Sequence, residues 1–181
     1  FGLDRDLEDV AAGKELERSD PRFSMVQGNF ADLERYVRDW GVEERLDGIL
    51  LDLGVSSPQL DNPDRGFSFA KDGPLDMRMD PTRGVSAAEW LNEAPEREIS
   101  RVLWEFGEER HARRIARKIV TERAHTPLTR TSQLAGLIEE MLGRRERKHP
   151  ATRSFQAIRI QVNNEMADLA KGLEAGIRQL R

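Results

Sequence analysis

Short apolar segments alternate with helical ones in the N-terminal part of the chain, and this alternation constrains the fold more than any other feature. Phe1–Leu3, Arg22–Val26 and Leu46–Asp52 have the apolar composition of strands. The intervening segments, Leu7–Leu16 and Phe30–Trp40, place apolar residues at helical spacing. Alternating strands and helices predict an α/β fold, in which a parallel sheet carries helices on its faces.

Polar residues stand at the expected carboxyl ends of these strands, where parallel sheets bind ligands. Asp4 is suited to accept hydrogen bonds from the two hydroxyls of a ribose, because the alternative role of helix N-cap is already filled by Asp6. Phe30 follows a strand and a glycine, and its position fits stacking on an adenine and ordinary core burial equally well. Asp52 ends the most apolar strand and precedes a glycine turn at Gly54, which favours a ligand site.

The rest of the chain divides into three segments by composition. Residues 54–85 contain four glycines and four prolines and predict a long, structured loop with a functional role. Residues 86–142 predict a block of helices, in which Ser86 and Glu89 have the spacing of a capping box. Residues 143–181 begin with a polar loop, and an apolar stripe then predicts one long helix. The stripe consists of Phe155, Ile158, Val162, Met166, Leu169, Leu173, Ile177 and Leu180.

Charge is distributed unevenly along the chain. The net charge is −4, yet residues 110–153 carry 12 Lys and Arg against 4 Asp and Glu. This predicts a local polyanion site, with a solvated charged helix face as the alternative.

The residue content also excludes several kinds of site. The absence of cysteine excludes disulfides and thiolate metal sites. No apolar run is long enough to span a membrane, and we expect a cytoplasmic protein. His149 has no partner at metal-ligand spacing, so we predict no metal site.

Several longer motifs are more specific than these features. They are, in chain order, LDLGVSSPQLD at 51–61, RGFSF at 65–69, DGPLDMRMD at 72–80, FGEER at 106–110, HPATR at 149–153 and FQA at 155–157. With these motifs in this order, the chain resembles the MraW family, also called the ribosomal RNA small-subunit methyltransferase H family. The resemblance runs along essentially the whole chain.

The resemblance implies a class I methyltransferase with a Rossmann-like α/β fold and an inserted all-helical subdomain. It implies that a methyl group passes from S-adenosylmethionine to the exocyclic N4 of a cytidine in the decoding region of 16S rRNA, with the small ribosomal subunit as partner. By matching position, the cofactor contacts are Asp4, Phe30, Asp52 and Gln59. Asp52 is also the expected catalytic residue.

The resemblance also predicts the domain organisation. Residues 1–85 would form part of the methyltransferase domain, with 54–85 as its substrate loop. Residues 86–142 would form the helical insertion, and residues 143–181 would return to the methyltransferase domain. We expect the chain to be cut from a longer protein at both ends, because the family's glycine-rich cofactor motif and fifth strand are absent. The missing central strand would leave exposed strand edges through which copies of the fragment could associate.

The target chemistry suggests roles for further residues. A cytosine amino group is a poor nucleophile because its lone pair is delocalised into the ring, so Asp52 is a candidate acceptor for its N–H bonds. The base would have to leave its stack and enter a pocket walled by residues 54–84 and 149–163. The expected substrate contacts are Ser56, Ser57, Arg153, Gln156, Arg159 and Asn163, with helix capping and surface salt bridges as the alternative for the last four. We expect Trp90 and Trp104 in the core of the helical block.

Two other classes of function are compatible with the residues. A Rossmann-type oxidoreductase would use Asp4 to bind the ribose of NAD, and calorimetry with NAD and with S-adenosylmethionine would distinguish the two enzymes. A non-catalytic RNA-binding module made from the helical block would keep its RNA affinity when Asp52 is lost.

Overall fold

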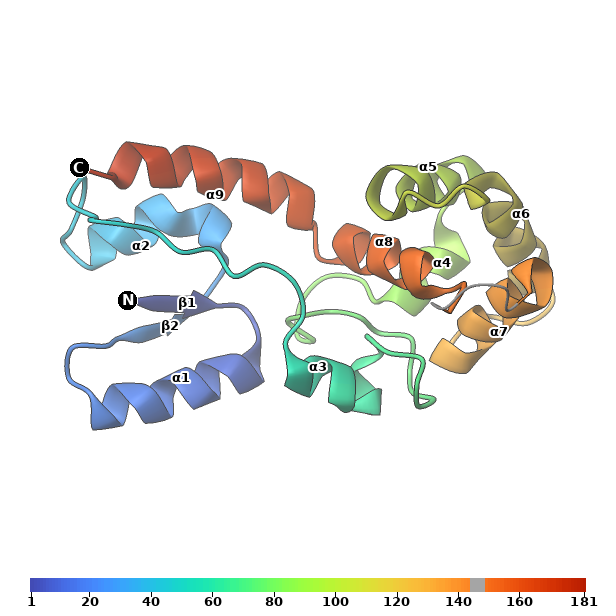
Figure 1. The fold of residues 1–181 in the computed structure, drawn as a ribbon, viewed down its shortest axis with the longest axis horizontal. Coiled ribbons are helices and arrows are strands. Elements are labelled where there is room, and N and C mark those ends of the chain that lie inside the picture. The colour runs from blue at the N-terminus through green and yellow to red at the C-terminus, as the bar shows by residue number, and fades with distance from the viewer. Residues whose placement is uncertain (144–148) are drawn as a thin grey trace. The chain divides into compact units, whose positions relative to one another are not determined.

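The chain forms two compact units. The computed structural model describes residues 1–143 and 149–181 (Figure 1). The strand unit contains residues 1–53 and 164–181, and the helical unit contains residues 54–163. The sequence predicted boundaries after residues 85 and 142. The two units instead meet at residues 53 and 163, because the glycine- and proline-rich loop 54–85 packs with the helices.

The strand unit is built on a parallel β–α–β arrangement. Its elements are β1 (Gly2–Asp4), α1 (Leu7–Ser19), β2 (Met25–Gln27), the 3-10 helix η1 (Phe30–Asp32), α2 (Leu33–Asp39) and α9 (Glu165–Gln179). β1 and β2 pair in parallel, with Asp4 opposite Gln27. Asp6 caps α1 as expected, because its carboxylate accepts the Glu8 N–H at 2.9 Å. α1 lies on one side of the two strands, and α2 and α9 lie on the other (Figure 1). This part of the predicted α/β pattern is confirmed.

The third expected strand, Leu46–Asp52, does not form. Within the described residues, the sheet consists of β1 and β2, and Leu46 makes only an isolated parallel bridge to Leu180. No strand among residues 1–143 and 149–181 pairs with the residues that follow Leu46, and Leu50 is 92% exposed. An apolar, β-prone sequence favours extension, but a strand also needs a neighbour that accepts and donates its backbone hydrogen bonds.

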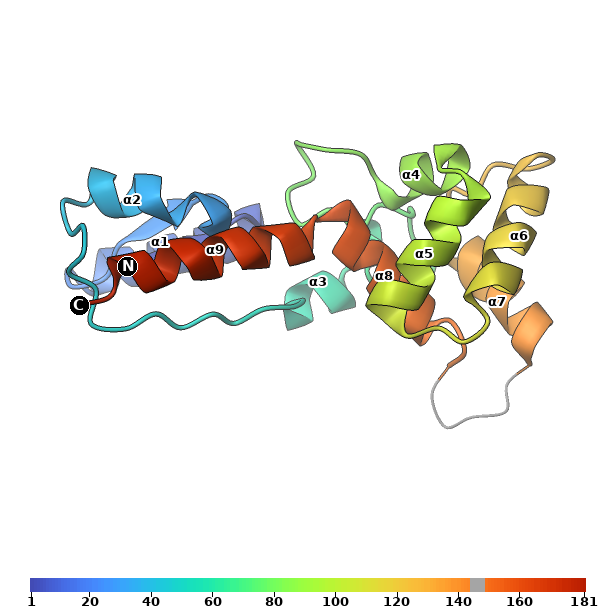
Figure 2. The same ribbon diagram turned by 90° about the horizontal axis from the view of Figure 1, so that it is seen from above.

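The helical unit contains the expected helices around a buried core. Its elements are α3 (Ser57–Asp61), the 3-10 helix η2 (Pro63–Arg65), α4 (Ala87–Glu93), α5 (Glu96–Gly107), α6 (Ala112–Arg123), α7 (Thr131–Leu142) and α8 (Thr152–Val162). α5 packs between α6 and α8 (Figure 2), and Ile99, Leu103 and Ile115 are fully buried in the core. The predicted capping box is confirmed: the Ser86 N–H donates to Glu89 Oε2 at 2.7 Å, and the Glu89 N–H donates to Ser86 Oγ at 3.2 Å.

The loop 54–85 is ordered by its contacts with the helices. Leu75 and Met77 are fully buried, and the Leu75 N–H donates to the Thr129 carbonyl at 2.9 Å. Gly66 has φ +73°, and a Cβ there would lie 2.4 Å from the Pro74 carbonyl oxygen, so this turn requires glycine. The loop is therefore part of the core of the helical unit.

Two expectations for the helices are wrong. The long C-terminal helix is two helices, α8 and α9, because Asn164 between them takes the left-handed conformation with φ +54°. Trp104 is 62% exposed, since it lies one position past Leu103 and therefore turns away from the buried face of α5. Trp90 does pack against the core, as expected. None of the described helices is long and apolar enough to cross a membrane.

Candidate functional site

Two predicted cofactor residues of the strand unit lie at neighbouring strand ends. The Gly28 N–H donates to the Asp4 carbonyl at 2.7 Å, which brings the segment leading to Phe30 beside the end of β1. The Asp4 side chain is half-buried, and its Oδ1 accepts the Asp6 N–H at 2.8 Å. Its Oδ2 has no hydrogen-bond partner among the described residues. This carboxylate can therefore still accept hydrogen bonds from a ligand.

A buried ion pair fixes this edge of the sheet to α9. Asp168 is 5% exposed and its Oδ2 accepts hydrogen bonds from Arg5 and from Asn29, both at 2.6 Å. Arg5 follows β1 and Asn29 follows β2, so a single carboxylate holds both strand ends. Asp168 is not among the site residues predicted from the sequence. The available signal was weak, because an acid beside the apolar stripe of a helix is usually solvated.

Phe30 packs against α9. A Cβ at Gly172 would lie 2.4 Å from Phe30 Cδ2, so the ring rests directly on the glycine backbone. The side chain is nevertheless only half-buried. Phe30 therefore contributes to packing between η1 and α9. Stacking of its exposed ring surface on an adenine stays a prediction.

Asp52 lies in the extended segment that follows the expected strand. Its side chain is exposed and has no hydrogen bond or ion pair within residues 1–143 and 149–181. Gly54 has φ +134°, a conformation that side chains disfavour, and the chain bends there, which favours glycine at this position. An unpaired, accessible carboxylate is chemically free to bind a donor.

The expected contacts at the start of α3 have a clear local role. Gln59 is 4% exposed, and its Oε1 accepts the Ser56 N–H at 3.0 Å, as in a capping box. Ser57 begins the helix and is exposed. The structure therefore shows Gln59 supporting the backbone at Ser56, whose Oγ is buried without a hydrogen-bond partner among the described residues.

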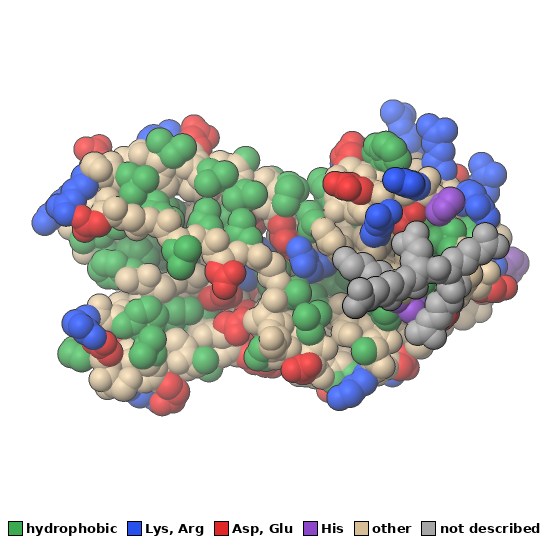
Figure 3. Space-filling model, in the orientation of Figure 1, with side chains coloured by type: hydrophobic (Ala, Val, Ile, Leu, Met, Phe, Trp, Pro, Cys, Tyr) green, Lys and Arg blue, Asp and Glu red, His purple; other side chains and the backbone are tan. Residues whose placement is uncertain are grey.

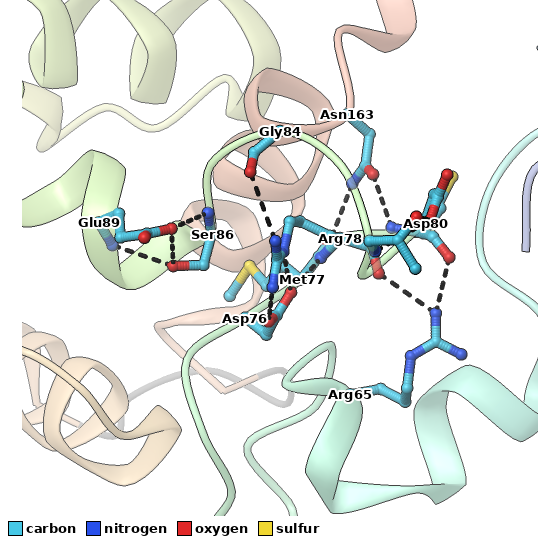
Figure 4. Close-up of polar contacts among 11 residues, drawn as sticks. Arg65, Asp76, Met77, Arg78, Asp80, Gly84, Ser86, Glu89 and Asn163 are labelled. Carbon is cyan, nitrogen blue, oxygen red and sulfur yellow. Dashed lines mark hydrogen bonds and ion pairs between the residues drawn. The ribbon is translucent and has the colours of Figure 1, made fainter.

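Asn163 is a junction between α8 and the loop (Figure 4). Its Oδ1 accepts the Met79 N–H at 2.8 Å, and its Nδ2 donates to the Met77 carbonyl at 2.7 Å and the Arg159 carbonyl at 2.9 Å. Met77 is fully buried with φ +63°, an unusual conformation for this residue. Arg65 closes the same turn from the other side, donating to the Met79 carbonyl at 2.9 Å. The amide of Asn163 thus positions the loop, while substrate contact by Asn163 and by the half-buried Arg159 stays a prediction.

Ion pairs hold residues 72–78 of the loop. Burial raises the pKa of Asp76, but hydrogen bonds from Arg78 at 2.7 and 2.9 Å outweigh it, and the net pKa lies below its usual range. Hydrogen bonds from Arg130 and Ser132 lower the pKa of Asp72 to about 2. Both carboxylates stay charged at neutral pH and act as supports of the loop rather than proton carriers.

Two sequence motifs that lie about forty residues apart meet at one groove of the helical unit. A groove of about 650 Å³ is lined by the turn 106–111, and on its other side by His149, Arg153 and Gln156. Arg153 and Gln156 are exposed on α8, as substrate contacts must be. Residues 144–148, four of which are Arg or Lys, belong to the expected polyanion segment and lie outside the described residues. Among the described residues, no cluster of three or more His, Asp or Glu side chains can hold a metal ion.

Close packing between α5 and α8 explains why α5 ends with glycine at Gly107. A Cβ at Gly107 would lie 2.6 Å from the Arg153 carbonyl oxygen and 3.0 Å from Ala157 Cβ. Only a residue without a side chain lets α5 approach α8 here. On the far side, His149 Nδ1 accepts the Ala151 N–H at 3.2 Å, and its ring packs on Phe69 with centroids 4.5 Å apart. Both walls of the groove are thus held by the core.

Two parallel strands, with helices on either side and a half-buried acid at a carboxyl end, fit an α/β protein, a class in which ligands bind at the carboxyl ends of the strands. Within that class the assignment is specific. The model of the MraW methylase family matches residues 1–181, and the chain belongs to this family. The predicted resemblance is confirmed. Membership implies S-adenosylmethionine as methyl donor and ribosomal RNA as the class of substrate.

Proposed function

We propose that the protein transfers a methyl group from S-adenosylmethionine to the exocyclic N4 of a cytidine in the decoding region of 16S rRNA. The observation that carries this proposal is the match to the MraW methylase family over the whole chain. The structure supports it with a free carboxylate in the strand unit and an open, polar groove in the helical unit.

The residues of the strand unit fit such a cofactor. Asp4 keeps one carboxylate oxygen without a hydrogen-bond partner among the described residues, and a carboxylate at a strand end suits the two hydroxyls of a ribose. Asp4, Phe30 and Asp52 of this unit would hold the cofactor, and Gln59, the fourth predicted contact, belongs to the helical unit. When bound, S-adenosylmethionine supplies an electrophilic methyl group.

Asp52 would act on the target amino group. Its carboxylate accepts one N–H of the cytosine amino group, which directs the nitrogen lone pair. As the new bond to nitrogen forms, the same carboxylate receives the released proton. An exposed acid with no ion-pair partner among the described residues is available for both tasks.

RNA contact would fall to the helical unit. Arg153 and Gln156 offer a cation and an amide on one wall of the 650 Å³ groove. Ser57, the first residue of α3, offers an exposed hydroxyl group, whereas the Oγ of Ser56 is buried and would have to become accessible to contact RNA. Asn163 and Arg159 would complete the binding surface while holding the loop in place. The RNA substrate must present its cytidine outside a helical stack, since a stacked amino group cannot be approached in line.

The test is methyl transfer to small ribosomal subunits by the full-length protein carrying Asp52→Asn. Loss of an acceptor worth about 3 kcal/mol in the transition state should lower kcat about a hundredfold at saturating cofactor. Asp39→Asn, an exposed acid of α2, is the matched control and should leave the rate unchanged. A rate for Asp52→Asn within tenfold of wild type, with unchanged circular dichroism, would refute the catalytic assignment.

A further inference from the structure

Trp104 is a large aromatic residue exposed on the helical unit. It lies on α5 and is 62% exposed, although tryptophan is usually mostly buried. Nothing in the core requires it there, because the buried face of α5 is completed by Ile99, Val102 and Leu103. An indole left in solvent offers a flat apolar surface, and such surfaces commonly mark contact sites.

The surroundings of Trp104 are strongly basic. A groove of about 860 Å³ is lined by Trp104 and by arginines of α5, α6 and the turn that joins them. These arginines are Arg97, Arg101, Arg110, Arg113 and Arg114. Figure 3 shows Lys and Arg side chains gathered over α5 and α6 at the upper right.

Most of this positive charge is not neutralised by the protein. Arg101 pairs with Glu105 at 2.6 Å. The acid in the lining, Glu96, is 3.7 Å from Arg117, which lies outside the groove. The other four arginines of the lining are exposed and have no ion pair with any residue that the structure describes. Four uncompensated guanidinium groups around one indole favour a ligand that combines negative charge with a flat ring.

We infer that this surface, the Trp104 groove, binds an unpaired nucleotide segment of the RNA substrate. One base stacks on the indole of Trp104, and the flanking phosphates pair with Arg97, Arg113 and Arg114. Aromatic rings and arginines that line a groove are the usual means by which proteins bind single-stranded RNA. Duplex RNA fits poorly, because its bases are already stacked on one another.

The Trp104 groove adjoins the groove proposed to receive the substrate. Arg110 and His111 line both of them. A strand that contacts Arg153 in one groove can therefore continue past Arg110 towards Trp104. This inference rests on the proposed function and extends it: the RNA is held at a second point on the helical unit, by residues other than those assigned to chemistry.

The experiment measures binding of a short, unstructured, fluorescently labelled oligoribonucleotide to the full-length protein. Trp104→Ala should weaken binding at least fivefold, and Trp104→Phe, which keeps an aromatic face, should restore most of it. The double variant Arg113→Gln and Arg114→Gln should lower the slope of log affinity against log salt by about 1.4. Binding of a duplex of the same sequence should be much less sensitive to Trp104→Ala.

The matched control is the double variant Arg117→Gln and Lys118→Gln. It removes the same charge from the same helix, but both residues lie outside the groove and are paired with Glu96 and Glu122 at 3.7 Å. Its salt slope should change by less than half as much as that of the groove variant. Equal changes would show a general charge effect and would overturn the inference.

Further outcomes separate the inference from the proposed function. In methyl transfer, Trp104→Ala should raise KM for RNA and leave kcat unchanged. If the wild type transfers no methyl group but Trp104→Ala still weakens RNA binding, the proposed function fails while the RNA surface stands. If RNA affinity is unaffected by Trp104→Ala, the inference is wrong. If poly-glutamate bound to the protein while RNA binding did not depend on Trp104, the partner of this surface would instead be an acidic protein.

Discussion

Replacing Gly107 by alanine should destabilise the protein, although alanine is the better helix former. Gly107 is the last residue of α5, and an added Cβ would lie 2.6 Å from the Arg153 carbonyl oxygen of α8. Carbon and oxygen atoms do not approach so closely, and the obstructing atom is backbone, so α5 and α8 must separate. Overpacking of this kind costs about 1–3 kcal/mol. The propensity gain from glycine to alanine is at most about 1 kcal/mol and is smaller at a helix end.

The expected net effect is therefore a loss of about 1–2 kcal/mol in the free energy of unfolding. Urea unfolding followed by far-ultraviolet circular dichroism would measure it. Gly136→Ala is the matched control, because Gly136 lies inside α7 and a Cβ there meets nothing within 4 Å. That substitution should stabilise the protein by about 1 kcal/mol. If both variants were stabilised alike, the tight contact between α5 and α8 would not exist.

Two further predictions concern carboxylates. Because the pKa of Asp72 is lowered to about 2 in the folded protein, its pairing with Arg130 should stabilise the fold above the unfolded pKa of about 3.9 and lose that effect as pH falls towards 2. Asp72→Asn should thus be less stable than wild type at pH 6 by thermal unfolding, and a difference that grew on acidification would contradict this sign. Asp168→Ala removes the buried partner of Arg5 and should cost about 3–5 kcal/mol, measured by urea unfolding, and a loss below about 1 kcal/mol would show that solvent replaces the pair.

Local signals in the sequence predicted most elements correctly. The caps formed by Asp6 and by Ser86 with Glu89 are contacts within three residues, so their geometry follows from nearby sequence alone. The block of helices expected over residues 86–142 is likewise present and contains α4, α5, α6 and α7.

The errors arose where distant residues decide the outcome. Leu46–Asp52 has a strand-like composition, but the pairing it needs comes from another part of a sheet. The apolar stripe continues across Asn163 and Asn164, yet the helix ends there because the Asn163 amide is bound to Met77 and Met79 of the loop. Periodicity could not show that interaction, since it joins residues more than eighty positions apart.

The features of the candidate site likewise separate into those that follow from local sequence and those that depend on distant residues. The sequence by itself determined the family, the strand end that carries Asp4, and the motifs that include Asp52 and Arg153, because these depend on residue identity and short-range order. Only the tertiary structure decided that Asp168 locks the strand ends together and that Trp104 faces solvent among unpaired arginines. Burial and ion pairing are properties of neighbours in space, and here those neighbours come from different helices and strands.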